Sequence, residues 1–353
     1  MTSQISIYKK IDEIIKTEGQ LPENFEAEER VYQEGELRFA PGALEGILGH
    51  HSSGGGGETS FSATLKKYLV MSDEDAMNNF EEEVAKEFKT ATEGQSILEE
   101  IFKNQQDYPA NKVFSIAVYF TSNGRKVETV KLGLSLLRLF DISENESICK
   151  LLETLGYCEE FTNYVTENTT SWEEKKRQDL YFKLAQKLHG WGKIDMVEMM
   201  EADTEEKKEW ILCHGCKNSI LYAYLGKVCA NKCDLYERLK KGNFSEEQMR
   251  GASDIIDGLL DEGPCAGMSV MENPVDLTIA YIEELKNHNL DIGYVNQLFA
   301  LAKYFEDKEY EDTDLIKEKI KSITDEIDIN KMIMEKGWVN HLVSESLKEM
   351  LFL

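Results

Sequence analysis

Apolar residues recur every three or four positions through most of this 353-residue chain. Such spacing places them on one face of an α-helix. Alternating β-branched segments separated by hairpin turns, which would predict a sheet, are nearly missing. The pattern therefore predicts an all-α chain, with clear examples at Val113, Ile116, Ala117 and Phe120, and at Leu180, Leu184 and Leu188.

Signals for helix ends support the same fold class. No proline falls between Ala110 and Gly263, and proline breaks helix interiors. Ser or Thr followed three residues later by Glu or Gln is typical of a helix start, and glycine is typical of a helix stop. The predicted starts are Ser143 with Glu146, Ser171 with Glu174, Ser245 with Gln248, and Asn273 before Pro274; the predicted stops are Gly190, Gly215 and Gly242.

Three stretches share one further pattern, an apolar helix, a short polar break and a second amphipathic helix. They begin at Val113, Leu180 and Leu298, and the segments FKLAQKL and FALAKYF are the most alike. A helix pair cannot bury both of its faces alone, so pairs of about 40 residues stack to form one continuous core. In this pattern the chain resembles the HEAT/armadillo type of αα-superhelix. The stretch Trp210–Ala230 also resembles uncharacterised bacterial helical-repeat proteins, which implies no activity.

The resemblance implies a solenoid of helix pairs preceded by a shorter, less regular N-terminal segment. We expect residues 1–58 to form this helical segment and a Gly-rich connection, and residues 59–353 to form the repeat body. Arrays of this kind usually present a surface for binding.

The N-terminal segment contains the stretch FAPGALEGILGHHSSGGGG, residues 39–57. Pro41 suits the first position of a helix, so we expect a docked helix over residues 39–49 and an exposed connection over 52–57. Ala43, Leu44, Ile47 and Leu48 would give that helix one apolar stripe. His50 and His51 are candidate metal ligands, but neighbours on a helix point about 100° apart and do not readily share one ion. Gly54–Gly57 lacks the Lys-Ser/Thr pair of a phosphate-binding loop and follows no strand.

The strongest metal-like motif is Cys213-x2-Cys216 followed by Cys229-x3-Cys233. Four such cysteines can hold zinc in a tetrahedral site. However, Ser219–Lys232 has the pattern of one continuous helix, which would hold the two pairs about 20 Å apart. The preferred interpretation is therefore that these thiols are buried and inert.

Other chemistry-bearing residues have simpler structural explanations. His189 with Trp191, and Trp338 with His341, are expected at turns between paired helices, without a nucleophile at a recognisable spacing. The acidic run from Glu306 to Asp314 is expected to be a solvated turn, with a contact for a basic partner as the alternative. No catalytic residue and no cofactor is assigned from the sequence.

Composition narrows the class of partner. The chain carries 66 Asp and Glu against 40 Lys and Arg, a net charge of -26. Such a surface repels nucleic-acid backbones and anionic membranes, so a basic protein or peptide is the partner class that the charge permits. Seven cysteines, with no visible signal peptide and no long apolar run, are typical of a cytoplasmic protein.

These observations favour a binding or scaffold protein that catalyses nothing, and one version is an inhibitor or immunity protein for a basic toxin or enzyme. The alternative is an enzyme or metal-dependent binder with its site in the concave groove. That alternative requires polar side chains with perturbed pKa values converging on one pocket.

Overall fold

The computed structural model describes residues 5–29, 39–51, 61–70 and 74–325. Within these ranges the protein consists of α-helices joined by turns and short 3-10 or π segments, and no strand occurs. The expectation of an all-α fold is confirmed. The chain divides into two compact units between Met200 and Glu201, and each unit is described by itself.

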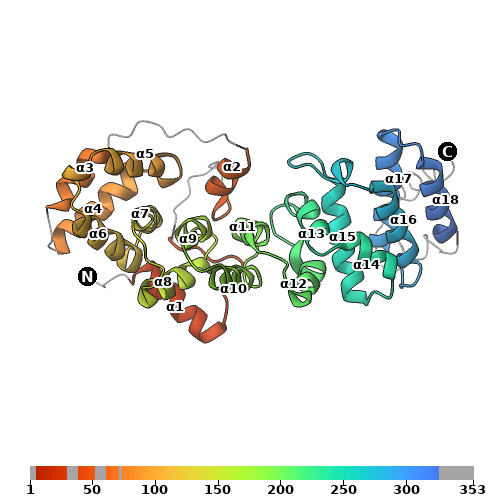
Figure 1. Cartoon of the computed structure of the whole chain (residues 1–353), viewed down its shortest axis with the longest axis horizontal. Helices are drawn as coiled ribbons and strands as arrows, with labels where there is room; N and C mark the ends of the chain where they lie inside the picture. Colours follow the sequence, from red (N-terminus) through yellow and green to blue (C-terminus); the bar gives the residue numbers. More distant parts are fainter. Residues whose placement is uncertain (1–4, 30–38, 52–60, 71–73, 326–353) are drawn as a thin grey trace. The chain divides into compact units, whose positions relative to one another are not determined.

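Unit 1 surrounds one central helix, α7 (Val127–Leu137), whose residues are all buried except the half-buried Glu128 (Figure 1). It packs on α6 and also contacts α4, α5 and α9. Aromatic rings fill the neighbouring core, where Tyr68 stacks on Phe80 with ring centroids 4.3 Å apart. The helices of unit 1 are α1 (Ile7–Glu18), α2 (Ala43–His51), α3 (Phe61–Leu69), α4 (Glu74–Glu87), α5 (Thr90–Lys103), α6 (Ala110–Asn123), α7, α8 (Glu146–Gly156), α9 (Thr162–Thr169), α10 (Glu174–Ala185) and α11 (Trp191–Met199).

Unit 2 is organised around α15 (Glu246–Leu260), which contacts α13 and α17 and the irregular chain before α13. Two glycines of α15 allow the backbone of this irregular chain to pack closely against the helix. A Cβ atom at Gly251 would lie 2.0 Å from the carbonyl oxygen of Leu212, and one at Gly258 would lie 2.5 Å from that of Tyr222. The other helices are α12 (Glu205–Trp210), continued by a π segment (Ile211–Gly215), α13 (Gly226–Lys232), α14 (Leu235–Lys241), α16 (Pro274–Leu285), α17 (Ile292–Asp307) and α18 (Thr313–Thr324).

The three helix pairs expected from the sequence are present. The stretch from Val113 forms α6 and α7, the stretch from Leu180 forms α10 and α11, and the stretch from Leu298 forms α17 and α18. The two helices of each pair pack against each other. The stacking of all such pairs into one superhelix remains a prediction.

The predicted helix ends are correct in part. Ser245 and Gln248 form the complete capping box at the start of α15, α16 begins at Pro274, and Gly242 ends α14 with a φ of 68°. Two predicted capping boxes are wrong. Helix α8 is capped by Asn145 rather than Ser143, and the residue that directly precedes α10 is Glu173 rather than Ser171. Gly190 precedes α11 rather than ending α10. Short polar residues in these turns compete for the cap, and the sequence does not decide which one is used.

The N-terminal elements pack within unit 1, where α1 contacts α6 and α8, and α2 contacts α11 and α5. The expected boundary between residues 58 and 59 and the connection 52–57 lie outside the described residues, as do Trp338 and His341. Among the described helices, none combines the length and the apolar character needed to cross a membrane.

Replacing Gly258 with Ala should destabilise unit 2 by about 1–3 kcal/mol, because the added methyl group would meet the backbone of Tyr222. In an exposed helix the same change is stabilising, so the sign of the effect reports the close approach. Urea denaturation measures it. Gly94→Ala in α5 is the matched control, since its Cβ would lie 3.2 Å from a side-chain methyl of Thr90 that can move. Equal effects at both positions would contradict the proposed role of Gly258.

Candidate functional site

A buried ammonium group lies near the middle of unit 1. Lys131 stands on α7 among apolar residues, and only 4% of it is exposed. Its Nζ atom is 2.7 Å from Oε1 of Glu45 on α2 and 2.9 Å from Oε2 of Glu160, just before α9. A buried charge is tolerated only when it is paired and hydrogen-bonded, so these two carboxylates account for the position of Lys131.

Tyr164 on α9 completes this group, which we call the Lys131 cluster: Lys131, Glu45, Glu160 and Tyr164. The Tyr164 hydroxyl donates to Glu45 Oε1 at 2.9 Å, so one oxygen of Glu45 receives two hydrogen bonds. The other oxygen, Oε2, is buried and has no hydrogen-bond partner in the structure. The cluster joins three segments that are far apart in the sequence, one each from α2, α7 and the start of α9.

The electrostatics of the cluster follow from burial and charge. Burial alone lowers the pKa of Lys131, but the carboxylates of Glu160 and Glu45 outweigh it and hold that pKa above its usual value. Burial, and then the charge of Glu45, raises the pKa of Tyr164 well above its usual value. Lys131 is therefore charged, and Tyr164 is a neutral donor, at physiological pH.

Asp195, on helix α11, has a perturbed pKa of its own. Burial, together with the negative charges of Glu198, Glu159 and Glu45, raises its pKa to about 8. Its carboxyl group therefore keeps its proton over much of the physiological range. Near this point, Nε2 of His50 lies 3.7 Å from Oε2 of Glu198, so α2 meets α11 through polar groups.

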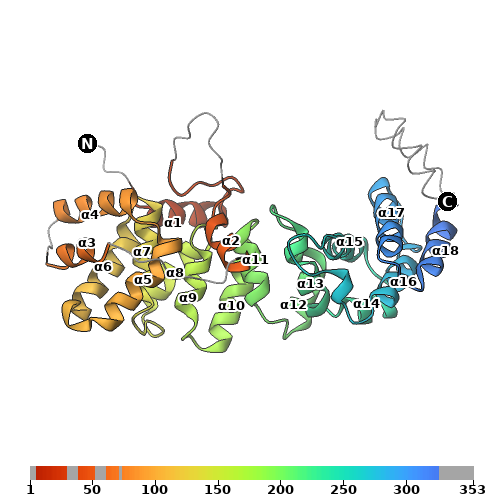
Figure 2. The same cartoon turned by 90° about the horizontal axis from the view of Figure 1, so that it is seen from above.

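Helix α2 lies against α11 in both views of unit 1 (Figures 1 and 2). Its contact face is small as well as polar: a Cβ at Gly46 would lie 2.2 Å from the indole of Trp191, and one at Gly42, whose φ is 73°, would lie 2.5 Å from the carbonyl oxygen of Glu159. The expected docked helix is present but begins at Ala43, since Pro41 and Gly42 form the turn before it.

The expected apolar stripe of α2 is wrong in orientation. Ala43 is buried, but Leu44 and Ile47 are 43% and 38% exposed, while Glu45 is buried. The carboxylate of Glu45 faces inward because Lys131 requires a partner, and the glycines fit the Trp191 ring. Apolar periodicity cannot reveal a helix that docks by its polar face.

The connection between α10 and α11 is fixed by one carboxylate. Glu159 accepts hydrogen bonds from the backbone N–H groups of His189, Gly190 and Gly192. His189 therefore lies at a turn between paired helices, as expected.

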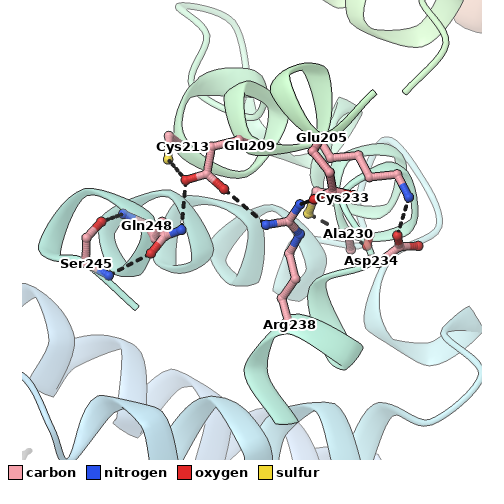
Figure 3. Close-up of polar contacts among 10 residues, drawn as sticks. Glu205, Glu209, Cys213, Ala230, Cys233, Asp234, Arg238, Ser245 and Gln248 are labelled. Carbon is pink, nitrogen blue, oxygen red and sulfur yellow. Dashed lines mark hydrogen bonds and ion pairs between the residues drawn. The ribbon is translucent and has the colours of Figure 1, made fainter. Parts of the chain in front are cut away.

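The four cysteines of the metal-like motif do not converge on one point. Cys213 faces Glu209, whose carboxylate also accepts from Gln248 and Arg238, and Cys233 lies beside Ala230 (Figure 3). Cys216 instead contacts the carbonyl oxygens of Tyr222 and Asp254. In the parts of the chain that the structure describes, no three His, Cys, Asp or Glu side chains are placed to hold a metal ion.

The expectation of one continuous helix between the two cysteine pairs is wrong. Ser219–Lys232 is not a single helix: Tyr222–Tyr224 is a 3-10 turn and α13 begins only at Gly226. The chain folds back, so a Cβ at Gly215 would lie 3.0 Å from the sulfur of Cys229. Cys216, Cys229 and Cys233 are buried, as expected, and burial raises the pKa of Cys213 to about 12. That these thiols are inert stays a prediction.

A second polar feature lies at one end of unit 2. Between Gly251 and Asp314 the chain has fifteen Asp and Glu against three Lys and Arg. An ion pair of 3.1 Å between Lys308 and Glu262 joins the α15–α16 connection to the α17–α18 connection. We call the carboxylates of these connections and the adjoining helix ends the acidic end: Asp261, Glu262, Glu272, Asp276, Glu306, Asp307, Glu309, Glu311, Asp312 and Asp314.

Most carboxylates of the acidic end are exposed, which confirms the expectation of a solvated turn at residues 306–314. Glu262 and Glu306 form ion pairs, with Lys308 and Lys317, whereas Asp307, Glu309 and Glu311 form none within the described residues. Val270 and Leu315 lie in the same segments and are 49% and 41% exposed. The surface therefore combines excess negative charge with exposed apolar groups.

A groove between α8 and α10 in unit 1 has a volume of about 760 Å³. Its lysines and carboxylates are equal in number, and Lys175 pairs with Asp179 at 2.7 Å. Lys176 lies 3.3 Å from the sulfur of Cys149 and 3.0 Å from the carbonyl oxygen of Ser143. The groove is balanced in charge and selects no class of ligand.

No family model, no curated protein and no solved structure matches this chain.

The sequence pattern indicates His50 and His51, which lie on α2 as Glu45 does, but it does not reveal the Lys131 cluster. His51 ends α2, and His50 contacts Glu198 and lies beside Trp191, with ring centroids 5.8 Å apart and the rings tilted by 38°. The available signal was Lys131, a lysine inside the otherwise largely apolar stretch VETVKLGLSLL. Its partner Glu45 lies 86 residues away, beyond the range of any local pattern.

Asp195→Asn should stabilise unit 1 increasingly as the pH rises from about 4 to about 8. In the unfolded chain Asp195 loses its proton near its ordinary pKa of 3.8, whereas in the folded protein it keeps that proton up to about 8. The wild-type fold therefore loses stability across this window, and Asn removes the loss. Urea denaturation should show a gain of about 1–2 kcal/mol at high pH, less than full burial would give because the group is half-buried.

Asp75→Asn, at an exposed carboxylate of the same unit, is the control for the loss of one charge. A constant difference between Asp195→Asn and wild type at every pH would contradict the raised pKa of Asp195.

Proposed function

We propose that this protein is a non-catalytic binding protein that holds a basic segment of another protein. The supporting observation is the acidic end of unit 2, whose carboxylates are mostly exposed and whose segments also expose Val270 and Leu315. Crowded like charges raise the local potential, and a cationic partner relieves their repulsion. Apolar groups within such a surface contribute area that leaves water on binding, so the interface does not depend on charge alone.

The proposal includes the kind of partner and its location. A basic protein or peptide fits this surface, whereas nucleic acids and anionic membranes are repelled by it. An inhibitor or immunity protein for a basic toxin or enzyme is one specific form. We place the protein in the cytoplasm, where its free cysteines would remain reduced.

The alternative function is an enzyme or a ligand-dependent binder with its site at the Lys131 cluster. The raised pKa of Asp195 favours it, since perturbed pKa values gather at catalytic sites. The side chains of the cluster are, however, engaged with one another and with α2, and ion-pair networks of purely structural origin also shift pKa values.

Charge reversal tests the acidic end directly. Asp307→Lys, Glu309→Lys and Glu311→Lys together should weaken binding of a fluorescent decalysine peptide by about tenfold, because three attractive charges become repulsive. Fluorescence anisotropy measures the affinity. Wild-type binding should itself weaken as salt rises to about 0.15 M, where exposed charges are screened within about 8 Å.

The matched control reverses Glu13, Glu18 and Glu82, three exposed carboxylates of unit 1, and changes the net charge equally. Its effect should stay within about twofold. If both triple variants lose the same affinity, binding reflects net charge alone and the acidic end is not the site.

A further inference from the structure

We propose that the surface of unit 1 covered by α2, formed by α5, α7, α9 and α11, is a docking site for an acidic helix. In this proposal α2 occupies the site within the chain, and a helix of a partner protein binds there by displacing α2. This site is separate from the acidic end and goes beyond the binding of a basic partner. Its ligand class is a short helix that carries one carboxylate between small residues.

The way α2 is held supports the exchange. Its inward face presents Ala43, Glu45 and Gly46, whereas Leu44 and Ile47 remain partly in solvent. A docked helix usually gains most of its binding free energy by burying such apolar side chains. Here the attachment combines one buried carboxylate, a close fit of Gly46 against Trp191, and contacts of His50 with Trp191 and Glu198. A competing helix that reproduces the carboxylate and the close fit can therefore replace α2.

The groups that bind the carboxylate of Glu45, Lys131 and Tyr164, remain in position when α2 is displaced. Lys131 is fixed from its other side by Glu160 at 2.9 Å, so its ammonium group stays paired when Glu45 leaves. Tyr164 presents its hydroxyl to the same oxygen of Glu45 that Lys131 contacts. Donors that are already in position lose little conformational entropy on binding.

The fit against Trp191 defines the partner further. Any side chain at the position of Gly46 would collide with the indole, and any at Gly42 with the backbone of Glu159. The partner helix therefore needs an acidic residue followed directly by glycine, with a second glycine three residues before it. Helix α2 shows this arrangement in the sequence GALEG.

The experiment uses the full chain with Glu45→Lys, in which repulsion between the new lysine and Lys131 releases α2. The probe is a fluorescent peptide of residues 39–51 with blocked ends. It should bind this variant about tenfold or more tightly than wild type, because in wild type the attached helix occupies the site. The amides of α2 should exchange with deuterium faster in the variant than in wild type.

Two further measurements distinguish specific binding of the carboxylate from nonspecific binding to the surface that α2 leaves. A peptide carrying Gln at the position of Glu45 should bind the variant about tenfold more weakly, because it lacks the charge. Adding Tyr164→Phe to the variant removes only a hydroxyl group. It should weaken the Glu peptide by about threefold or more and the Gln peptide less, because a hydroxyl donates a stronger hydrogen bond to a carboxylate than to an amide oxygen.

Equal affinity of the probe for the variant and wild type would overturn the proposal, as would equal affinity of the Glu and Gln peptides. So would α2 amides that stay as protected in the variant as in wild type. A wild-type dimer that dissociates with Glu45→Lys would also overturn it, since the occupant would then be a second copy of this chain. Circular dichroism and thermal melting verify that every variant is folded.

Discussion

The arrangement of unit 1 depends on how a single buried cation is neutralised. Lys131 stands on α7, the most enclosed helix of the unit, and cannot reach water without leaving the core. An unpaired ammonium group there would cost several kcal/mol, so carboxylates from two other segments must meet it. This requirement draws Glu160 to the start of α9 and Glu45 on α2 to the same point. Helix α2 thereby packs within the unit although two of its apolar residues, Leu44 and Ile47, are exposed.

The two units use a similar excess of acid in different ways. Residues 1–200 contain 35 Asp and Glu against 22 Lys and Arg, and residues 201–353 contain 31 against 18, so each half carries a net charge of -13. In unit 1, Glu45 and Glu160 point inward to Lys131, and Asp195 beside them keeps its proton. In unit 2 the carboxylates gather outward on exposed connections, where solvent screens them and a partner can reach them. Net charge alone therefore does not distinguish the two units; the exposure of their carboxylates does.

The sequence predicted the features that arise from local patterns. The helix pairs beginning at Val113, Leu180 and Leu298 are present because apolar spacing fixes which face of a helix is buried. The prediction from sequence was wrong where contacts between distant segments determine the local structure. Ser219–Lys232 has helical spacing, yet close packing of α15 on Tyr222 bends the chain before Gly226. The inward face of α2 was likewise hidden, because its determinant, Lys131, is distant in the sequence.

A further consequence concerns the position of Asp195. Its pKa is raised partly by Glu45, a residue that belongs to α2. Linkage is reciprocal, so the proton on Asp195 must in turn favour the docked position of Glu45. When the pH passes about 8 and Asp195 becomes charged, the negative groups facing α2 repel its carboxylate more strongly. We therefore expect the contact between α2 and α11 to weaken as the pH rises past about 8.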